Sequence, residues 1–307
     1  MIPYMGSKRI SAGKIFQAIS NLHPNGGMLV DLFCGGFAIS EYFYKNGWRV
    51  IANDKNKYVI ALLKTIIFDS IEENKLTKFV TRKMFEDIKN NPDNYEDWYV
   101  GFVQCCWSFG NNQRGYLFGK NVESIKKAGH EIVINKNPEF IQKLITDIPQ
   151  KYIDGIIKQD TWHKRRIALC KVSDKLKMRL EQLQQLQQMQ HLQRLEQLER
   201  LERLEQLQQL ERLELSSMDY REVKIPKGAI IYCDPPYKGT TEYKENEFNH
   251  NEFFEWVKIK SENNPIYFSE YQSPEKFKKI LEFGRNSTLC SGYNKKQPNE
   301  CLFTIGE

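Results

Sequence analysis

The residues best suited to chemistry are Asp234, Pro235, Pro236 and Tyr237, which directly follow an apolar run over residues 229–233. The composition of this run is that of a buried strand, and two consecutive prolines end it. The sequence therefore predicts an acid and an aromatic ring at the carboxyl end of a strand, where open α/β sheets place their functional residues.

An Asp-Pro-Pro-Tyr segment is suited to methylation of the exocyclic amine of a base. The lone pair of such an amine is delocalised into the ring, so the nitrogen is a poor nucleophile. We expect the Asp234 carboxylate and the Pro235 carbonyl to accept its N–H bonds, with the Tyr237 ring stacked on the base. The prolines add carbonyls without competing N–H donors. The alternative is that the segment is only a turn after a strand. Other motifs must decide between the catalytic and the structural interpretation.

Length and composition indicate a globular protein. The chain has 307 residues, 40% of them apolar, and is long enough for two domains. The formal net charge of +6 is compatible with a polyanionic partner but does not require one. Seven cysteines without a C-x-x-C pair predict neither a disulfide framework nor a metal site. No apolar run approaches the roughly 18 residues of a membrane span, so we expect a cytoplasmic protein without an export signal.

A glycine turn early in the chain predicts the first unit of a nucleotide-binding sheet. Residues 28–33 are strand-like and, except for Asp31, apolar; Gly35 and Gly36 follow, and a helical pattern covers residues 38–43. Glycines in such a turn let the backbone approach a ligand closely. Because the full G-x-G-x-x-G spacing is missing, a ligand without a pyrophosphate is favoured over a dinucleotide.

A second strand is predicted over residues 48–52 and a helix over 57–68. Asp54 follows the strand about 20 residues after the glycine turn, which is the position of an acid that binds ribose hydroxyls. A role for Asp54 as a helix N-cap remains open. Before the first strand, residues 4–8 form a glycine-containing turn, and a helix is predicted over 10–22; this pair could contact a nucleotide or be a plain cap and helix.

The middle of the chain, residues 69–178, lacks the strand–turn–helix rhythm and is predicted to be a mainly helical, inserted domain. It has 19 Lys or Arg against 15 Asp or Glu. Its loop at 107–116 combines amides, an arginine and aromatics, which can pair with base edges or wedge between bases. The candidates for base contacts are Asn111, Asn112, Gln113, Arg114 and Tyr116. The candidates for phosphate contacts are Lys164, Arg165 and Arg166. The alternative for the loop is an ordinary polar loop, and the alternative for the basic cluster is a solvated helix face.

Residues 180–213 form a low-complexity array with leucine or methionine at every third position. The composition favours helix, but a period of three does not match the 3.6 residues of an α-helical turn, so the leucine stripe winds around the helix. An α-helix is favoured over an extended 3₁₀-helix or disorder. The array contains no catalytic group, and a spacer, a self-association element and a tolerated repeat expansion all remain open.

Strand and turn signals resume after the array. Asp219 lies in a loop after a short predicted strand, where it could bind the adenine of a cofactor or be a lone acid in a turn. The further predicted elements are a strand at 213–215, a mobile loop at 243–248, a helix at 251–262 and strands at 265–269 and 302–305.

Together, these stretches resemble the Dam-type (D12 class) DNA adenine-N6 methyltransferases in their alpha arrangement, over roughly the first 66 residues and again from 213 to 307. The matching motifs are Tyr4-Met5-Gly6-Ser7-Lys8, Asp31-Leu32-Phe33-Cys34-Gly35-Gly36, Asn53-Asp54, Met218-Asp219-Tyr220 and Asp234-Pro235-Pro236-Tyr237. Phe37 departs from the family pattern, since it stands where a second glycine is usual. The middle domain matches only loosely, and the leucine array lies outside the pattern.

The resemblance implies an α/β fold of the class I S-adenosylmethionine-dependent methyltransferases, Rossmann-like with a mixed seven-stranded sheet and an inserted helical DNA-recognition domain. The implied domains are a catalytic domain at 1–68 and 214–307, a recognition domain at 69–178 and the leucine segment at 179–213. The implied cofactor-binding residues are Tyr4, Lys8, Asp31, Phe33, Gly35, Gly36, Asp54, Asp219 and Tyr220.

The implied reaction transfers a methyl group to an adenine flipped out of double-stranded DNA, without a metal. Phe248 would cover the second face of that adenine. Cytosine-N4 methylation remains an alternative, because the same geometry serves both amines, and so does a catalytically inactive DNA-binding protein of the same fold. The sequence leaves open whether the enzyme belongs to a restriction–modification pair.

Overall fold

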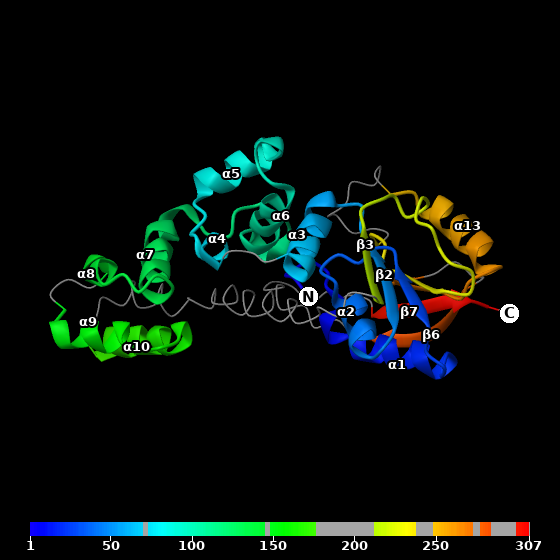
Figure 1. Cartoon of the computed structure of the whole chain (residues 1–307), viewed down its shortest axis with the longest axis horizontal. Helices are drawn as coiled ribbons and strands as arrows, with labels where there is room; N and C mark the ends of the chain where they lie inside the picture. The colour runs from blue at the N-terminus through cyan, green and yellow to red at the C-terminus, as the bar shows by residue number, and fades with distance from the viewer. Residues whose placement is uncertain are drawn as a thin grey trace. The chain divides into compact units, whose positions relative to one another are not determined.

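The computed structural model describes residues 1–69, 73–144, 148–175, 212–237, 248–272, 277–283 and 299–306 (Figure 1). The chain divides into two compact units, one formed by Met1–Lys64 with Leu207–Glu307 and the other by Thr65–Gln206. The leucine array predicted at 180–213 lies outside the described residues except for its last two positions. The loop predicted at 243–248 lies outside them except for Phe248.

The first unit is built on a seven-stranded sheet in the order β3-β2-β1-β4-β5-β7-β6. Its strands are β1 (Met28–Asp31), β2 (Arg49–Asn53), β3 (Leu213–Ser216), β4 (Ile230–Cys233), β5 (Ile266–Glu270), β6 (Phe277–Phe283) and β7 (Glu300–Ile305). Strands β1 to β5 are parallel, and β7 runs antiparallel to both β5 and β6. The mixed sheet confirms the predicted α/β fold.

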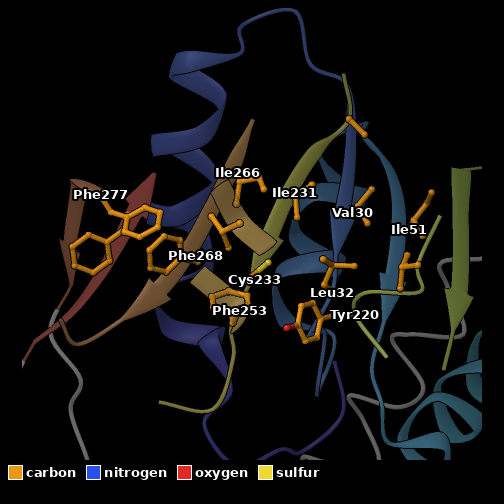
Figure 2. Close-up of a cluster of buried hydrophobic side chains, with 14 of the residues drawn as sticks. Val30, Leu32, Ile51, Tyr220, Ile231, Cys233, Phe253, Ile266, Phe268 and Phe277 are labelled. Atoms are coloured by element: carbon orange, nitrogen blue, oxygen red, sulfur yellow. The ribbon is translucent and has the colours of Figure 1, made fainter. Parts of the chain in front are cut away.

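The central strands are mainly apolar and buried because both of their faces are covered. Val30, Ile231 and Ile266 lie in a buried cluster on one face of the sheet, shown in Figure 2. Helix α13 (His250–Ser261) completes this cluster with Phe253 and Val257. The helix begins where the side chain of Asn249 accepts a hydrogen bond from the backbone N–H of Glu252.

Helices α1 (Ala12–Leu22) and α2 (Ala38–Lys45) pack against each other and lie on the opposite side of the sheet from α13 (Figure 1). The rings of Phe16, Phe43 and Trp48 meet there edge to face. A 3₁₀ turn, η1 (Lys8–Ile10), precedes α1, so the helix predicted from residue 10 begins two residues later. Helix α3 has the predicted bounds, Lys57–Phe68.

The antiparallel end of the sheet is the part that the sequence predicts least well. Strand β6 is not predicted, and β7 begins at Glu300 instead of Leu302. Four of the seven residues of β6 are lysine, leucine or glutamate, which favour helices, and a bulge between Lys279 and Leu281 interrupts its alternation. Charged side chains are common on an edge strand, where they discourage pairing with other chains.

The described elements of the second unit are all helices or 3₁₀ turns, apart from one isolated β-bridge. Its helices are α4 (Glu73–Thr77), α5 (Arg82–Asn90), α6 (Asp97–Cys106), α7 (Glu123–Val133), α8 (Glu139–Leu144), α9 (Gln150–Ile157) and α10 (Trp162–Lys175), with 3₁₀ turns at Pro92–Asn94, Phe109–Asn111 and Lys120–Val122. Helices α7 to α10 share a core that includes Ile132, Ile156 and Leu169. None of the helices in the described ranges of the chain is long and apolar enough to cross a membrane.

Candidate active site

Three carboxyl groups gather at the edge of the sheet where the parallel strands end. Asp31 is the last residue of β1, Asp54 follows β2 and Asp234 follows β4. Because β1 lies between β2 and β4, the three acids occupy neighbouring positions. Besides burial, the charges of Asp234 and Asp54 both raise the pKa of Asp31, as expected for carboxylates that lie close together.

Asp31 is buried, and its two carboxylate oxygens differ in their hydrogen bonding. Oδ2 accepts a hydrogen bond of 2.6 Å from Oγ of Ser40 on α2. Oδ1 is buried without a hydrogen-bond partner among the described residues. Burial, together with the neighbouring carboxylates, raises the pKa of Asp31 to about 7. An unpaired buried carboxylate oxygen costs free energy until a donor reaches it, and a cationic donor would stabilise it most.

The glycine turn after β1 is packed against the amino-terminal segment. A Cβ on Gly36 would lie 2.7 Å from the carbonyl oxygen of Ile2, and one on Gly35 would lie 2.8 Å from the Tyr4 ring. Gly35 also has a left-handed φ of 44°. Phe37 has a φ of 69° with its side chain fully buried. The departure from the expected glycine therefore places a bulky residue in a conformation that glycine adopts more readily.

Asp54 links the first two strand ends. Its Oδ2 accepts from the backbone N–H of Gly35 at 2.9 Å, and its Oδ1 accepts from that of Asn56 at 2.9 Å. The cap of α3 is formed by Asn56 itself, whose Oδ1 accepts from the N–H of Tyr58. The alternative role of Asp54 as the cap of this helix is therefore taken by Asn56. Burial raises the pKa of Asp54, and each of its oxygens has a second lone pair for a ligand.

Asp234 is engaged by two side chains. Nζ of Lys8 lies 2.7 Å from Oδ2, and the hydroxyl of Tyr237 donates to Oδ1 at 2.9 Å. The Lys8 ammonium also lies 4.8 Å from the centroid of the Tyr237 ring, and the ring of Tyr271 contacts that of Tyr237 at 4.7 Å. Burial and the charge of Asp234 hold the pKa of Tyr237 well above its usual range, so Tyr237 stays protonated. The side chain of Asp234 retains 18% exposure.

An aromatic cluster flanks the other side of the glycine turn. The ring of Phe33 contacts those of Tyr220, Phe248 and Phe253 at centroid distances of 5.4 to 6.1 Å. The ring of Phe248, the residue predicted to cover the target base, also contacts those of Tyr220, Phe253 and His250. Phe248 thus lies with Phe33 and Tyr220, the residues that the sequence assigns to the cofactor.

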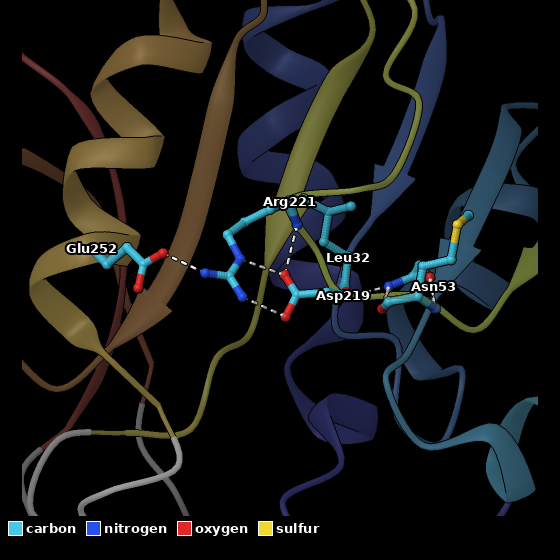
Figure 3. A network of polar contacts seen from close by, with 6 residues as sticks. Leu32, Asn53, Asp219, Arg221 and Glu252 are labelled. Carbon is cyan, nitrogen blue, oxygen red and sulfur yellow. Dashed lines mark hydrogen bonds and ion pairs between the residues drawn. The ribbon is translucent and has the colours of Figure 1, made fainter.

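The loop after β3 is held by a network that sequence analysis did not foresee (Figure 3). The buried amide of Asn53 donates to the carbonyls of Leu32 and Met218 at 3.2 and 3.0 Å and so ties three strand ends together. Asp219, the next residue, accepts from Nε of Arg221 at 2.7 Å, and Arg221 also pairs with Glu252. Asn53 was visible in the sequence only as the neighbour of Asp54, since its partners lie far away in the chain.

The family model described as D12 class N6 adenine-specific DNA methyltransferase matches residues 4–283 of the chain. The chain belongs to this family. The match spans both parts of the sheet unit and confirms the resemblance predicted from the motifs. A search of curated proteins gives no significant match.

Membership of the D12 family makes the chain a DNA methyltransferase that acts on the N6 position of adenine. The family implies the use of S-adenosylmethionine. The unpaired oxygen of Asp31 and the tight glycine turn are compatible with a small ligand carrying an ammonium group. Among the described residues, no group of His, Cys, Asp and Glu is arranged to hold a metal ion.

The loop predicted to contact bases in this methyltransferase is a closed turn in the second unit. Ser108 and Tyr116 form a β-bridge, and the backbone N–H of Phe109 donates to the carbonyl of Gly115 at 2.7 Å. The amide oxygen of Asn112 accepts from the N–H groups of Arg114 and Gly115, so it maintains the turn. The turn presents Phe109, 55% exposed, together with the exposed side chain of Arg114.

Two of the predicted DNA contacts are corrected by their burial. Tyr116 packs against Phe85, and its hydroxyl donates to the carbonyl of Val80 at 2.8 Å. Arg165 is buried, with Nε donating to the carbonyl of Val133 at 2.6 Å. Its Nη1 donates to two further carbonyls at the turn before α10. Both side chains therefore hold the helical unit together, whereas Lys164 is exposed.

Proposed function

We propose that this methyltransferase acts on an adenine flipped out of double-stranded DNA and that Asp234 accepts the hydrogen bonds of its amino group. The observation that supports this most is the gathering of Asp31, Asp54 and Asp234 at one edge of the sheet. A strand end at the centre of a sheet is too deep to reach a base inside a duplex, so the base must leave the stack.

S-adenosylmethionine supplies an electrophilic methyl group. In our proposal, Oδ1 of Asp31 binds its ammonium group, because this buried oxygen has no other hydrogen-bond partner among the described residues. Asp54 binds the ribose hydroxyls with the lone pairs that its two backbone contacts leave over. The backbone of Gly35 and Gly36 lies close to the bound S-adenosylmethionine. The remaining predicted cofactor contacts come from Tyr4, Phe33, Asp219 and Tyr220. Lys8, which the motif resemblance also assigns to the cofactor, is bound to Asp234 and is given a role at the target base instead.

At the target base, Asp234 and the Pro235 carbonyl draw the amine toward tetrahedral geometry by accepting its two N–H bonds. Pro235 and Pro236 contribute no N–H groups of their own, so no backbone donor in this segment competes for these acceptors. The Tyr237 hydroxyl donates to Oδ1 of Asp234 and thereby orients the carboxylate. The ring of Tyr237 stacks on the base, and Phe248 encloses the site from the side of Phe33.

The second unit is proposed as the DNA-recognition domain. Asn111, Gln113 and Arg114, with Asn112 maintaining the turn, would contact bases, and the side chains of Lys164 and Arg166 would contact phosphates. The backbone of Asn111 and Gln113 is in the left-handed region, at φ values of 56° and 62°, which bends the loop tightly enough to present its tip. Self-association through the leucine array and a cytoplasmic location stay predictions.

The test is methylation of duplex DNA by purified protein with radiolabelled S-adenosylmethionine, followed by mass spectrometry of the nucleosides. We expect N6-methyladenine, and we expect Asp234→Ala to retain less than a few per cent of the activity. Glu282→Gln is the matched control, since this exposed acid of β6 pairs with Lys279 and should not affect the rate. Substantial activity in Asp234→Ala would refute the proposed role of the carboxylate.

A further inference from the structure

Glu300 is a buried acid beside the active site that the sequence motifs do not include. Strand β7 runs antiparallel to β5, with Cys301 opposite Glu270 at the end of β5. The first residue of β7 therefore lies at the edge where the parallel strands end, the same edge that carries Asp234. The side chain of Glu300 is only 4% exposed.

Lys8 lies between the two acids. Its Nζ is 2.7 Å from Oδ2 of Asp234 and 3.8 Å from Oε2 of Glu300, and its side chain is 6% exposed. The charge of Glu300 also helps to raise the pKa values of Tyr237 and Tyr232, so its carboxylate acts on the residues around Asp234. One buried ammonium thus has two competing carboxylates, and it is bound to the one proposed to meet the substrate.

This arrangement creates a conflict for Asp234. While Lys8 donates to Oδ2, it occupies an acceptor position and offsets the negative charge that should attract the N–H bond of adenine. A shift of Nζ by about 1 Å toward Oε2 would bring Glu300 within hydrogen-bond range, so the ammonium has a second carboxylate close enough to accept it. Without an anion at position 300, the buried ammonium would lose the second of these two carboxylates and would remain on Asp234.

We propose that Glu300 is a positioning residue for methyl transfer, which takes over Lys8 when the adenine amine binds Asp234. This inference rests on the proposed role of Asp234. It assigns to Lys8 two positions, one on Asp234 before the base enters and one on Glu300 while the base is bound.

The experiment measures kcat and KM for Glu300→Gln, Lys8→Met and the double variant, varying S-adenosylmethionine and duplex DNA in turn while the other substrate is saturating. We expect Glu300→Gln to lower kcat about tenfold or more while leaving both KM values nearly unchanged. In the Lys8→Met background, where no ammonium can remain on Asp234, the same substitution should change kcat by less than about twofold. Glu282→Gln serves as the control, because it removes an exposed carboxylate from the adjacent strand.

Equal losses from Glu300→Gln in both backgrounds would overturn the proposal, since a structural role of Glu300 does not depend on Lys8. An unchanged kcat in Glu300→Gln would overturn it as well. Glu300→Asp is a second variant that keeps the charge. It should retain more activity than Glu300→Gln, and an equal or greater loss would contradict the role of the charge. Because Asp234→Ala tests the proposed function separately, an inactive Asp234→Ala with a fully active Glu300→Gln would refute the role of Glu300 alone.

Discussion

Asp31 should make the binding of S-adenosylmethionine depend on pH. In the free protein, burial and two neighbouring carboxylates raise the pKa of Asp31 to about 7. An ammonium group placed on Oδ1 favours the ionised form, so binding should release a proton whenever Asp31 starts out protonated. The affinity should therefore rise with pH up to about 7 and change little above it.

The magnitude follows from the fraction of Asp31 that is ionised. With a pKa of about 7, roughly half of the molecules are ionised at pH 7 and about one in eleven at pH 6. The dissociation constant should then be about fivefold higher at pH 6 than at pH 7, a difference of about 1 kcal/mol. The ligand does not produce this change, because an α-amino group with a pKa near 7.7–8.0 stays largely charged over this range.

Isothermal titration calorimetry at pH 6 and pH 7, in two buffers with different ionisation enthalpies, measures both the affinity and the protons released. Asp31→Asn is the matched variant, since it keeps the shape of the side chain but cannot titrate. We expect weaker binding by this variant with a much smaller pH dependence, so that any remaining slope reports other groups such as Asp54. Equal affinities of the unsubstituted protein at the two pH values, without proton release, would refute the assignment of Asp31 to the ammonium group.

Three further predictions concern stability and DNA contact. At Phe37, glycine should be better tolerated than alanine, because both lose about 3–5 kcal/mol of packing but only glycine relieves the strain of a φ of 69°; chemical denaturation should give the opposite order at Phe43, inside α2. Arg165→Met should lower the free energy of unfolding by about 3 kcal/mol, since it leaves buried carbonyls without donors. Lys164→Met should leave stability nearly unchanged and weaken DNA binding with a smaller salt dependence; a stable Arg165→Met that binds DNA poorly would restore Arg165 as a phosphate contact.

The positions of the motif acids were predictable because the signals that place them are local. Apolar runs, glycines and prolines next to Asp31, Asp54 and Asp234 define where each strand ends, and parallel strands end at one edge of a sheet. The bounds of α3 were equally local, since twelve residues form one helical pattern. Strand β6 was missed because its two lysines, its leucine and its glutamate favour helix, and its pairing with β7 overrides that preference.

The loop at 107–116 shows that residue types alone do not identify DNA contacts. Asn111 to Tyr116 all have side chains that can contact DNA, and the sequence could not separate the residues that shape the turn from those it presents. Tyr116 pairs with Ser108 in a β-bridge, and its hydroxyl donates to a carbonyl in the core. The side chain of Asn112 accepts a backbone hydrogen bond that closes the turn. Arg165 was selected as part of a basic cluster, although carbonyls from three different positions surround it.

The sequence by itself determined the fold class, the family and the three acids at the strand ends, because each depends on neighbours in the chain or on motif order. Only the tertiary structure decided how those acids are partnered. Oδ1 of Asp31 has no partner among the described residues, Lys8 pairs with Asp234, and an antiparallel strand brings Glu300 to the same edge. Burial and ion pairing arise between residues that are far apart in the chain, and for that reason no local pattern could predict them.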